Sequence, residues 1–178
     1  MNVKELLGIK IIDKNGKEVA KVADLRFDVK TYNISAIYGS AGNPISKKYY
    51  EVDPASIIAM GEYLLISQTI EELEETVVTK IPTEDGTSTI NQGLEKTVID
   101  KEGNIAGKIT NIEIEKDPFA VTGIIVEKAG GSFGKPKAKY SINKEDITTN
   151  GDYVILNKVI EEPKEEEAEE ADAEADEE

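Results

Sequence analysis

The sequence contains no cysteine, no histidine and no tryptophan, and Arg26 is its single arginine. Without cysteine and histidine the chain cannot form disulfides, thiolate or imidazole zinc sites, or catalytic triads that use either residue. Arginine is the side chain that most often contacts bases and phosphates, and this chain has only one. We therefore expect no nucleic-acid partner. We therefore predict a protein that is not an enzyme and that uses no cofactor and no metal.

Long hydrophobic runs are also missing. No stretch approaches the roughly 18–20 apolar residues that a membrane span needs, and the first residues carry no signal-peptide hydrophobic region. We expect a cytoplasmic protein without direct membrane insertion. A length of 178 residues with 39% hydrophobic content is enough for one ordinary domain or two small ones.

The negative charge is concentrated at the C-terminal end. Residues 161–178 contain twelve acidic residues and one lysine, and so contribute −11 of the net charge of −15. This segment has no large apolar side chain that could repay the entropy of folding. It is predicted to be a disordered tail that either solubilises the protein or contacts a basic partner.

An internal repeat is present. Residues 12–16, Ile-Asp-Lys-Asn-Gly, recur 87 positions later as Ile-Asp-Lys-Glu-Gly. The same spacing aligns residues 34–37 with 121–124, and a spacing of 90 aligns residues 50–65 with 140–155, so the second copy has three extra residues in its central loop. Three matching blocks in one order indicate a duplication.

Each copy begins with a predicted β-hairpin. Alternating residues 10–12 and 19–27 flank the turn at residues 13–16, whose glycine can take a positive φ. A third strand is expected over residues 33–39, and its equivalent over 121–127, because β-branched residues crowd an apolar run of strand length there.

The second part of each copy starts with a variable loop, at residues 40–48 and 128–139. A short strand near residues 50–52 follows. Residues 53–54, Asp-Pro, then predict a helical turn, since aspartate caps free amides and proline is tolerated at the first helical position. The last strand is expected over residues 63–66.

The strand pattern decides the fold class. About five short strands in each copy are too few for a sandwich but can close into a small barrel without open edges. We predict a mainly β protein of two tandem small β-barrels joined by a short helix and linker, with the acidic tail behind them. The expected units are repeat 1 at residues 1–66, helix and linker at 67–91, repeat 2 at 92–160 and the tail at 161–178.

A turn glycine followed by apolar and small residues and then by Asp or Asn resembles the signature of the PRC-barrel family. The matching residues are Gly16, Val19, Ala20, Val22, Asp24 and Leu25 in the first copy, and Gly103, Ala106, Gly107, Ile109, Asn111 and Ile112 in the second. The closing parts, Gly61 with Tyr63 and Gly151 with Tyr153, also fit. Ala20 stands where the family usually has glycine, and Asn111 where it usually has aspartate.

This resemblance implies a docking module without chemistry of its own. The family includes the photosynthetic reaction centre H subunit and the C-terminal domain of a ribosome maturation factor. Tandem copies with acidic tails look like archaeal cell-division proteins, which implies an adaptor at the division site. The implied partners are another PRC-barrel protein or the membrane anchor of the division ring, and a homodimer is an alternative. The alternative function is a ribosome maturation or RNA-processing accessory protein.

A short amphipathic helix is predicted between the two copies. Thr69 and Glu72 have capping-box spacing, and Ile70, Leu73 and Val77 fall on one helical face. The apolar face can pack on the barrels or bind a partner. Residues 82–89 read as a flexible, turn-rich linker.

Two aromatic residues complete the candidate docking residues. Tyr49 and Tyr50 are adjacent in a strand and must point to opposite faces, so one of them meets solvent or a partner. Phe133 lies in a glycine-rich loop that fails as a phosphate loop, because Pro136 replaces the hydroxyl residue. The predicted partner-binding residues are therefore Tyr49, Phe133, Ile70, Leu73 and Val77.

Overall fold

The computed structural model describes residues 1–162, and the predicted disorder of the tail from residue 163 lies outside the described residues. The first part of the chain contains α1 (Val3–Leu6), β1 (Lys10–Ile12), β2 (Glu18–Asp28), β3 (Ile34–Asn43), β4 (Ser46–Val52), η1 (Pro54–Ser56), β5 (Ile57–Met60) and β6 (Tyr63–Ile66). The connection contains α2 (Ile70–Glu74) and β7 (Thr87–Thr89). The last part contains α3 (Ile90–Gly93), β8 (Thr97–Ile99), β9 (Ile105–Lys116), β10 (Phe119–Lys128), η2 (Ser132–Gly134), β11 (Ala138–Asn143), η3 (Lys144–Asp146), β12 (Ile147–Asn150) and β13 (Val154–Leu156).

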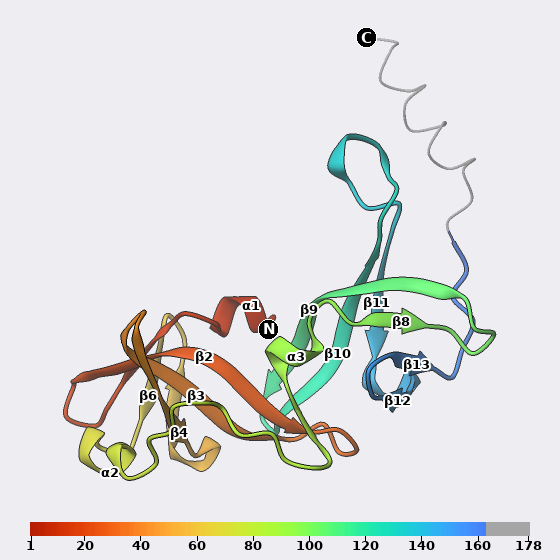
Figure 1. Ribbon diagram of the computed structural model, residues 1–178. Helices are drawn as coiled ribbons and strands as arrows, with labels where there is room; N and C mark the ends of the chain where they lie inside the picture. Colours follow the sequence, from red (N-terminus) through yellow and green to blue (C-terminus); the bar gives the residue numbers. More distant parts are fainter. Residues whose placement is uncertain (163–178) are drawn as a thin grey trace.

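The strands form two curled sheets with the same topology, side by side in Figure 1. The first sheet has the order β4-β3-β2-β1-β6-β5, with β7 added beside β2, and the second has the order β11-β10-β9-β8-β13-β12. In both sheets the first and last strands of the repeat pair in parallel, β1 with β6 and β8 with β13. The predicted mainly β fold of two barrel-like halves is confirmed.

Closure of the barrels is less complete than predicted. Among the described residues, β4 and β5 do not pair, and neither do β11 and β12, so each sheet is a half-barrel with two edges. The reason is local: η1 and η3 connect these strand pairs through a corner of three residues. The edge of β4 is covered in part by a bridge between Tyr49 and Val78.

The hairpin turns have the predicted form. An Asp13 Oδ1 atom accepts hydrogen bonds from the amides of Asn15 and Lys17, at 2.8 and 2.9 Å, and Gly16 has φ 76°. Asp100 makes the same two bonds in the second copy. The carboxylate therefore holds a turn that glycine alone permits.

Two predicted irregular segments contain strand. Residues 40–48 are mostly β3 and β4, because the ladder continues to the pair Asn43 and Ser46, and the Asn43 side chain accepts from the Ile45 and Ser46 amides. Residues 87–89, predicted as part of a flexible linker, form β7 on β2.

The two copies are paired across a pseudo-two-fold axis. Thr89, which caps α3, pairs with Arg26 of β2, and at the equivalent positions Asn2, which precedes α1, pairs with Glu113 of β9. Asn33 pairs with Ala120, which is its own equivalent 87 positions later. The N-terminal segment of each repeat thus lies on the long second strand of the other repeat. The arrangement is that of a symmetric dimer whose two subunits are joined in one chain.

This crossing explains Asn111, which departs from the family pattern. In the first repeat an oxygen of Asp24 accepts from the amide of Asn91 in α3 at 3.1 Å. In the second repeat the Asn111 side-chain amide instead donates to the side-chain oxygen of Asn2, just before α1. An aspartate at residue 111 would place two acceptors against each other.

Ala20 has a similar explanation. A side-chain carbon on Gly39 of β3 would come within 2.9 Å of the Ala20 methyl group, so the methyl occupies the space that this glycine leaves. The second repeat has Gly107 at this position, with φ 147°, and a side-chain carbon there would strike the Glu127 carbonyl oxygen, so the backbone of β10 requires glycine.

The hydrophobic core is shared by both halves. The buried apolar residues of the two sheets form one cluster, which includes Leu6 of α1 and Ile90 of α3, both without exposed surface. The two small helices are therefore parts of a joint interior.

Truncation of a core side chain in α3 should destabilise both halves together. We expect Ile90→Ala to lower the free energy of unfolding by about 2–5 kcal/mol, since a cavity forms where the side chain was. Ile58→Ala, at a residue 61% exposed, is the matched control and should change it by less than about 0.5 kcal/mol. Urea unfolding followed by circular dichroism measures both, and two separate transitions would contradict a shared core.

Acid should weaken the two turns. Backbone hydrogen bonds from Lys17 and Asn104 lower the pKa of Asp13 and Asp100 below their usual value. A lowered pKa in the folded state gives stability that is present above the unfolded pKa and is lost as the pH falls through the folded value. We expect the free energy of unfolding to fall between about pH 5 and pH 2.5, and to fall less in Asp100→Asn than in the control Glu102→Gln.

Candidate functional site

The β10–β11 hairpin extends beyond the body of the protein (Figure 1). Its ladder continues to the pair Lys128 and Ala138, and a loop at residues 129–137 closes it. We call residues 125–141 the arm. The equivalent β3–β4 hairpin of the first repeat ends in the shorter turn at residues 44–45.

The tip of the arm carries Phe133, whose side chain is fully exposed. Its φ is 55°, in the left-handed region where a non-glycine residue is strained, although glycines stand on both sides at residues 131 and 134. Neither packing nor backbone geometry accounts for a phenylalanine here. Phe133, one of the predicted partner-binding residues, is thus open to solvent.

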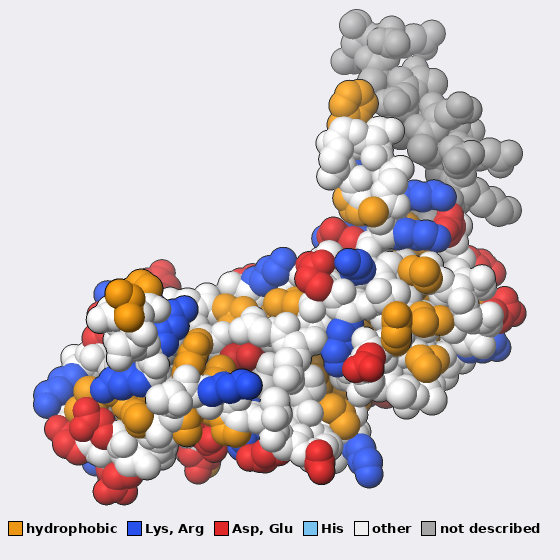
Figure 2. Space-filling view, in the orientation of Figure 1, with side chains coloured by type: hydrophobic (Ala, Val, Ile, Leu, Met, Phe, Trp, Pro, Cys, Tyr) orange, Lys and Arg blue, Asp and Glu red, His pale blue; other side chains and the backbone are white. Residues whose placement is uncertain are grey.

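The first repeat has a matching apolar tip that the sequence analysis missed. Ile45 is 98% exposed at the end of the β3–β4 hairpin. Figure 2 shows hydrophobic side chains at the far end of each hairpin. In the sequence Ile45 lies in a segment of turn composition, Asn-Pro-Ile-Ser-Lys-Lys at residues 43–48. A large apolar residue in such a segment was the signal that could have identified this exposed tip.

A groove with a volume of about 680 Å³ lies at the base of the arm, between it and the β8–β9 sheet. Its walls combine apolar and basic side chains, chiefly Ile105, Ala129, Pro136, Lys108, Lys128 and Lys135. Gly107 is in the floor, where any side chain would strike the Glu127 carbonyl oxygen. We call this cavity the groove.

At Lys128 the groove borders a second cavity of about 450 Å³, which Tyr140 and the carboxylate of Glu162 also line. We call this border the rim. Glu162 makes ion pairs with Lys128 and, at 3.0 Å, with Lys137. Hydrogen bonds from these two ammonium groups lower the pKa of Glu162. Beside them the buried hydroxyl of Tyr140 has no hydrogen-bond partner among the described residues, and burial raises its pKa. At the rim two lysines thus hold one carboxylate of the described chain.

The other predicted docking residues lie in the first repeat. The predicted helix is α2, with the capping box of Thr69 and Glu72, at 3.2 and 2.7 Å. The helix ends at Glu74, so Val77, predicted on the same helical face, lies beyond it and is 39% exposed. Leu73 is completely buried, so a partner cannot reach its side chain, whereas Ile70 is half-buried.

Tyr49 and Tyr50 take opposite faces as predicted. Tyr50 is buried. Tyr49 is half-buried, and its backbone exchanges two hydrogen bonds with Val78, at 2.8 and 2.9 Å. The structure places Tyr49, Ile70, Leu73 and Val77 in the first repeat and Phe133 on the arm of the second, so the five residues do not form one site.

The single arginine, Arg26, attaches the segment that connects the two repeats to the first sheet. Arg26 donates to Tyr38 and to Glu84, both at 2.8 Å, and pairs with Glu51 at 3.4 Å. Burial, together with the Glu51 carboxylate, raises the pKa of Tyr38 to about 12. The cluster joins the segment before β7 to the first sheet and is fully occupied by these contacts.

Other kinds of site find little support in residues 1–162. Within this range no group of three or more acidic side chains could hold a metal ion. The helices described here are all too short or too polar to cross a membrane. The exposed Phe133 on the arm and the exposed Ile45 at the other hairpin tip are features of the described surface that packing does not explain.

In comparisons with known proteins, no protein-family model matches this chain and no curated protein matches it significantly. The likeness to the PRC-barrel family therefore stays a prediction from the signature residues.

Replacement of the tip phenylalanine should not cost stability. We expect Phe133→Gly to raise the free energy of unfolding by up to about 1 kcal/mol, because it relieves the left-handed backbone and removes no packed contact. Chemical denaturation measures the change, and a loss above about 1 kcal/mol would show that the ring is packed.

The matched control is Tyr32→Gly. Tyr32 also has a positive φ, 63°, but it is 8% exposed and its ring stacks on Phe27 with 6.1 Å between the centroids. This variant should lose about 3 kcal/mol through loss of packing.

Proposed function

We propose that the protein is a non-catalytic adaptor that binds a protein partner through the arm and the groove. Phe133 is the apolar anchor of this contact. The lysines around the groove select a partner with acidic side chains next to an apolar pocket. The first repeat supports the second through the shared core.

The observation that carries this proposal is the strained, fully exposed Phe133 at the end of the arm. Large aromatic side chains that fill a partner's pocket dominate binding energy at protein interfaces. A backbone strain that packing does not repay is typical of functional positions. Electrostatic complementarity around such an anchor adds specificity and speeds association.

The cellular setting of this proposal comes from the resemblance to archaeal PRC-barrel proteins. We propose a cytoplasmic cell-division assembly, with another PRC-barrel protein or the membrane anchor of the division ring as partner. The docking proposal itself rests on the arm and does not depend on this setting.

Affinity capture with a matched variant tests the proposal. A chain ending at Glu162 is immobilised as wild type and as Phe133→Gly, and cross-linked proteins from native cells are identified by mass spectrometry. We expect a protein partner that binds saturably to the wild type and at least about tenfold more weakly to the variant, the loss typical of an interface anchor. Ile58→Ser, on the exposed face of β5, should bind like the wild type.

The outcomes separate the candidate functions. A partner captured equally by Phe133→Gly, or no saturable partner, would refute docking through the arm. Ile45→Gly tells whether the tip of the first repeat takes part. Enrichment of ribosomal proteins together with co-sedimentation with a subunit would favour ribosome maturation instead.

A further inference from the structure

We infer that residues 163–178 of the same chain bind the groove and compete there with an acidic partner. This inference rests on the proposed docking function, because it names what regulates that site. The occupant is a defined segment of this chain, and three features of the described residues support it.

The chain is fixed as it approaches the groove. The amide of Asn157 donates to the Asp146 carbonyl at 2.9 Å, and the Lys158 carbonyl accepts from the amide of Lys101 at 3.2 Å. The Lys158 side chain pairs with Asp146 at 2.7 Å, and Ile160 packs against the core. The segment after β13 therefore brings Glu162, the last described residue, to the base of the arm.

A carboxylate of this segment already occupies the rim. Glu162 lies between Lys128 and Lys137, as described above, and Lys128 also lines the groove. The next acidic residues begin at Glu165. A carboxylate of the tail that displaces Glu162 would meet the same two ammonium groups.

The charges are complementary. Residues 163–178 contain ten acidic residues and one lysine. The groove and the arm present Lys108, Lys128, Lys135, Lys137 and Lys139. Figure 2 shows Lys side chains gathered at the base of the arm.

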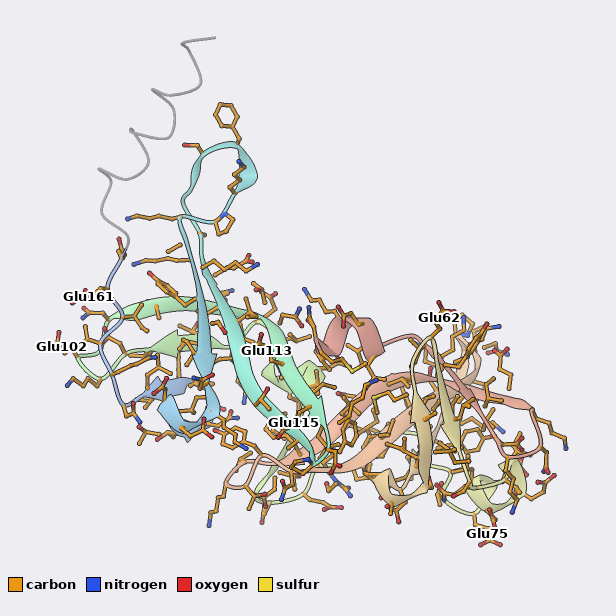
Figure 3. All side chains as sticks on the ribbon, turned by 180° about the vertical axis from the view of Figure 1, so that it is seen from behind. Glu62, Glu75, Glu102, Glu113, Glu115 and Glu161 are labelled. Atoms are coloured by element: carbon orange, nitrogen blue, oxygen red, sulfur yellow. The ribbon has the colours of Figure 1, made fainter. Side chains whose placement is uncertain are left out.

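Few carboxylates near the groove would repel an acidic tail. Glu95 and Glu127 line the groove, and Glu127 is paired with Lys139 at 3.6 Å. In Figure 3, Glu102 and Glu161 lie at the outer end of the second half, and Glu113 and Glu115 lie on β9 toward the first half, away from the arm.

The first repeat contains the same arrangement in folded form. Ile70-Glu71-Glu72 is repeated 90 positions later as Ile160-Glu161-Glu162. In the first repeat this segment enters α2, which packs against β4, with Glu74 at 4.0 Å from Lys48. In the second repeat Glu162, the equivalent of Glu72, pairs with Lys137 next to β11. Leu73, the buried anchor of α2, is replaced by Pro163, so charge must supply the attraction that packing supplies in the first repeat.

A peptide added in trans tests the inference directly. The probe is a fluorescent peptide with the sequence of residues 163–178, and its anisotropy is measured with the full chain and with a chain ending at Glu162. We expect binding to the shortened chain that weakens as salt is added. Binding to the full chain should be at least about tenfold weaker, because a tethered competitor has an effective concentration near millimolar.

Matched variants locate the contact. Lys128→Gln with Lys137→Gln in the shortened chain should weaken peptide binding at least about fivefold, whereas Lys14→Gln with Lys30→Gln, at exposed lysines of the first repeat, should leave it unchanged. A peptide with Gln and Asn in place of every Glu and Asp should not bind. In the nuclear magnetic resonance spectrum, the amide signals of Gly130, Gly131 and Gly134 should shift on removal of the tail and return when the peptide is added.

Two results would overturn the inference: no binding to the shortened chain, or equal binding to both chains. Neither would affect the docking proposal, since its capture experiment uses a chain without the tail. Conversely, peptide binding that is lost with the lysine variants, in a protein whose partner capture ignores Phe133, would retain the tail contact and remove the docking function of the arm.

Discussion

The crossed pairing of the two repeats is the constraint on which the rest of the structure depends. A curled sheet of six short strands leaves two edges and part of its apolar face uncovered. Each sheet receives the missing cover from the other repeat, through α1 on β9 and α3 on β2. The bridge between Asn33 and Ala120 closes the contact at its centre. The two half-barrels thereby share one core.

Residue patterns in the sequence were sufficient to predict the elements that depend on local chemistry. The Asp13 turn, the capping box at Thr69 and the proline-led turn η1 follow from side chains a few residues apart, and all three are present. Because the sequence is duplicated, the two repeats were expected to have the same strand order, and they do. The elements that the sequence did not predict, α1, α3 and β7, depend on distant partners. They are only three or four residues long and pack on the other repeat, so they show no hydrophobic periodicity.

One residue of the candidate site, Phe133, could be predicted from the sequence, whereas the groove beside it could not. Phe133 could be identified because its glycine-rich, lysine-rich neighbours cannot bury an aromatic ring. The groove could not, because its walls come from β8, β9 and the arm, which only the fold brings together. Leu73 shows the reverse case, since helical periodicity gives an apolar face but does not tell whether the protein or a partner covers it.

Gly107 and Ala20 show how duplication allows one copy to change. Both belong to the same signature position, yet the alanine fills space left by Gly39, while the glycine lies in the floor of the groove. The first copy keeps a short hairpin and the second has lengthened its own. A fold held by both halves lets one of them acquire a cavity while the other maintains the interior.

The long-range bridge of Asn2 to Glu113 also bears on how the protein is made. A ribosome releases the chain from its N-terminus, so α1 emerges long before β9, the strand that it must cover. The contact of α1 with β9, and with it the shared core, therefore cannot be completed until β9 has been synthesised. During that interval nascent chains on neighbouring ribosomes can exchange their first segments, and the symmetry that joins the repeats within one molecule would serve equally to join two.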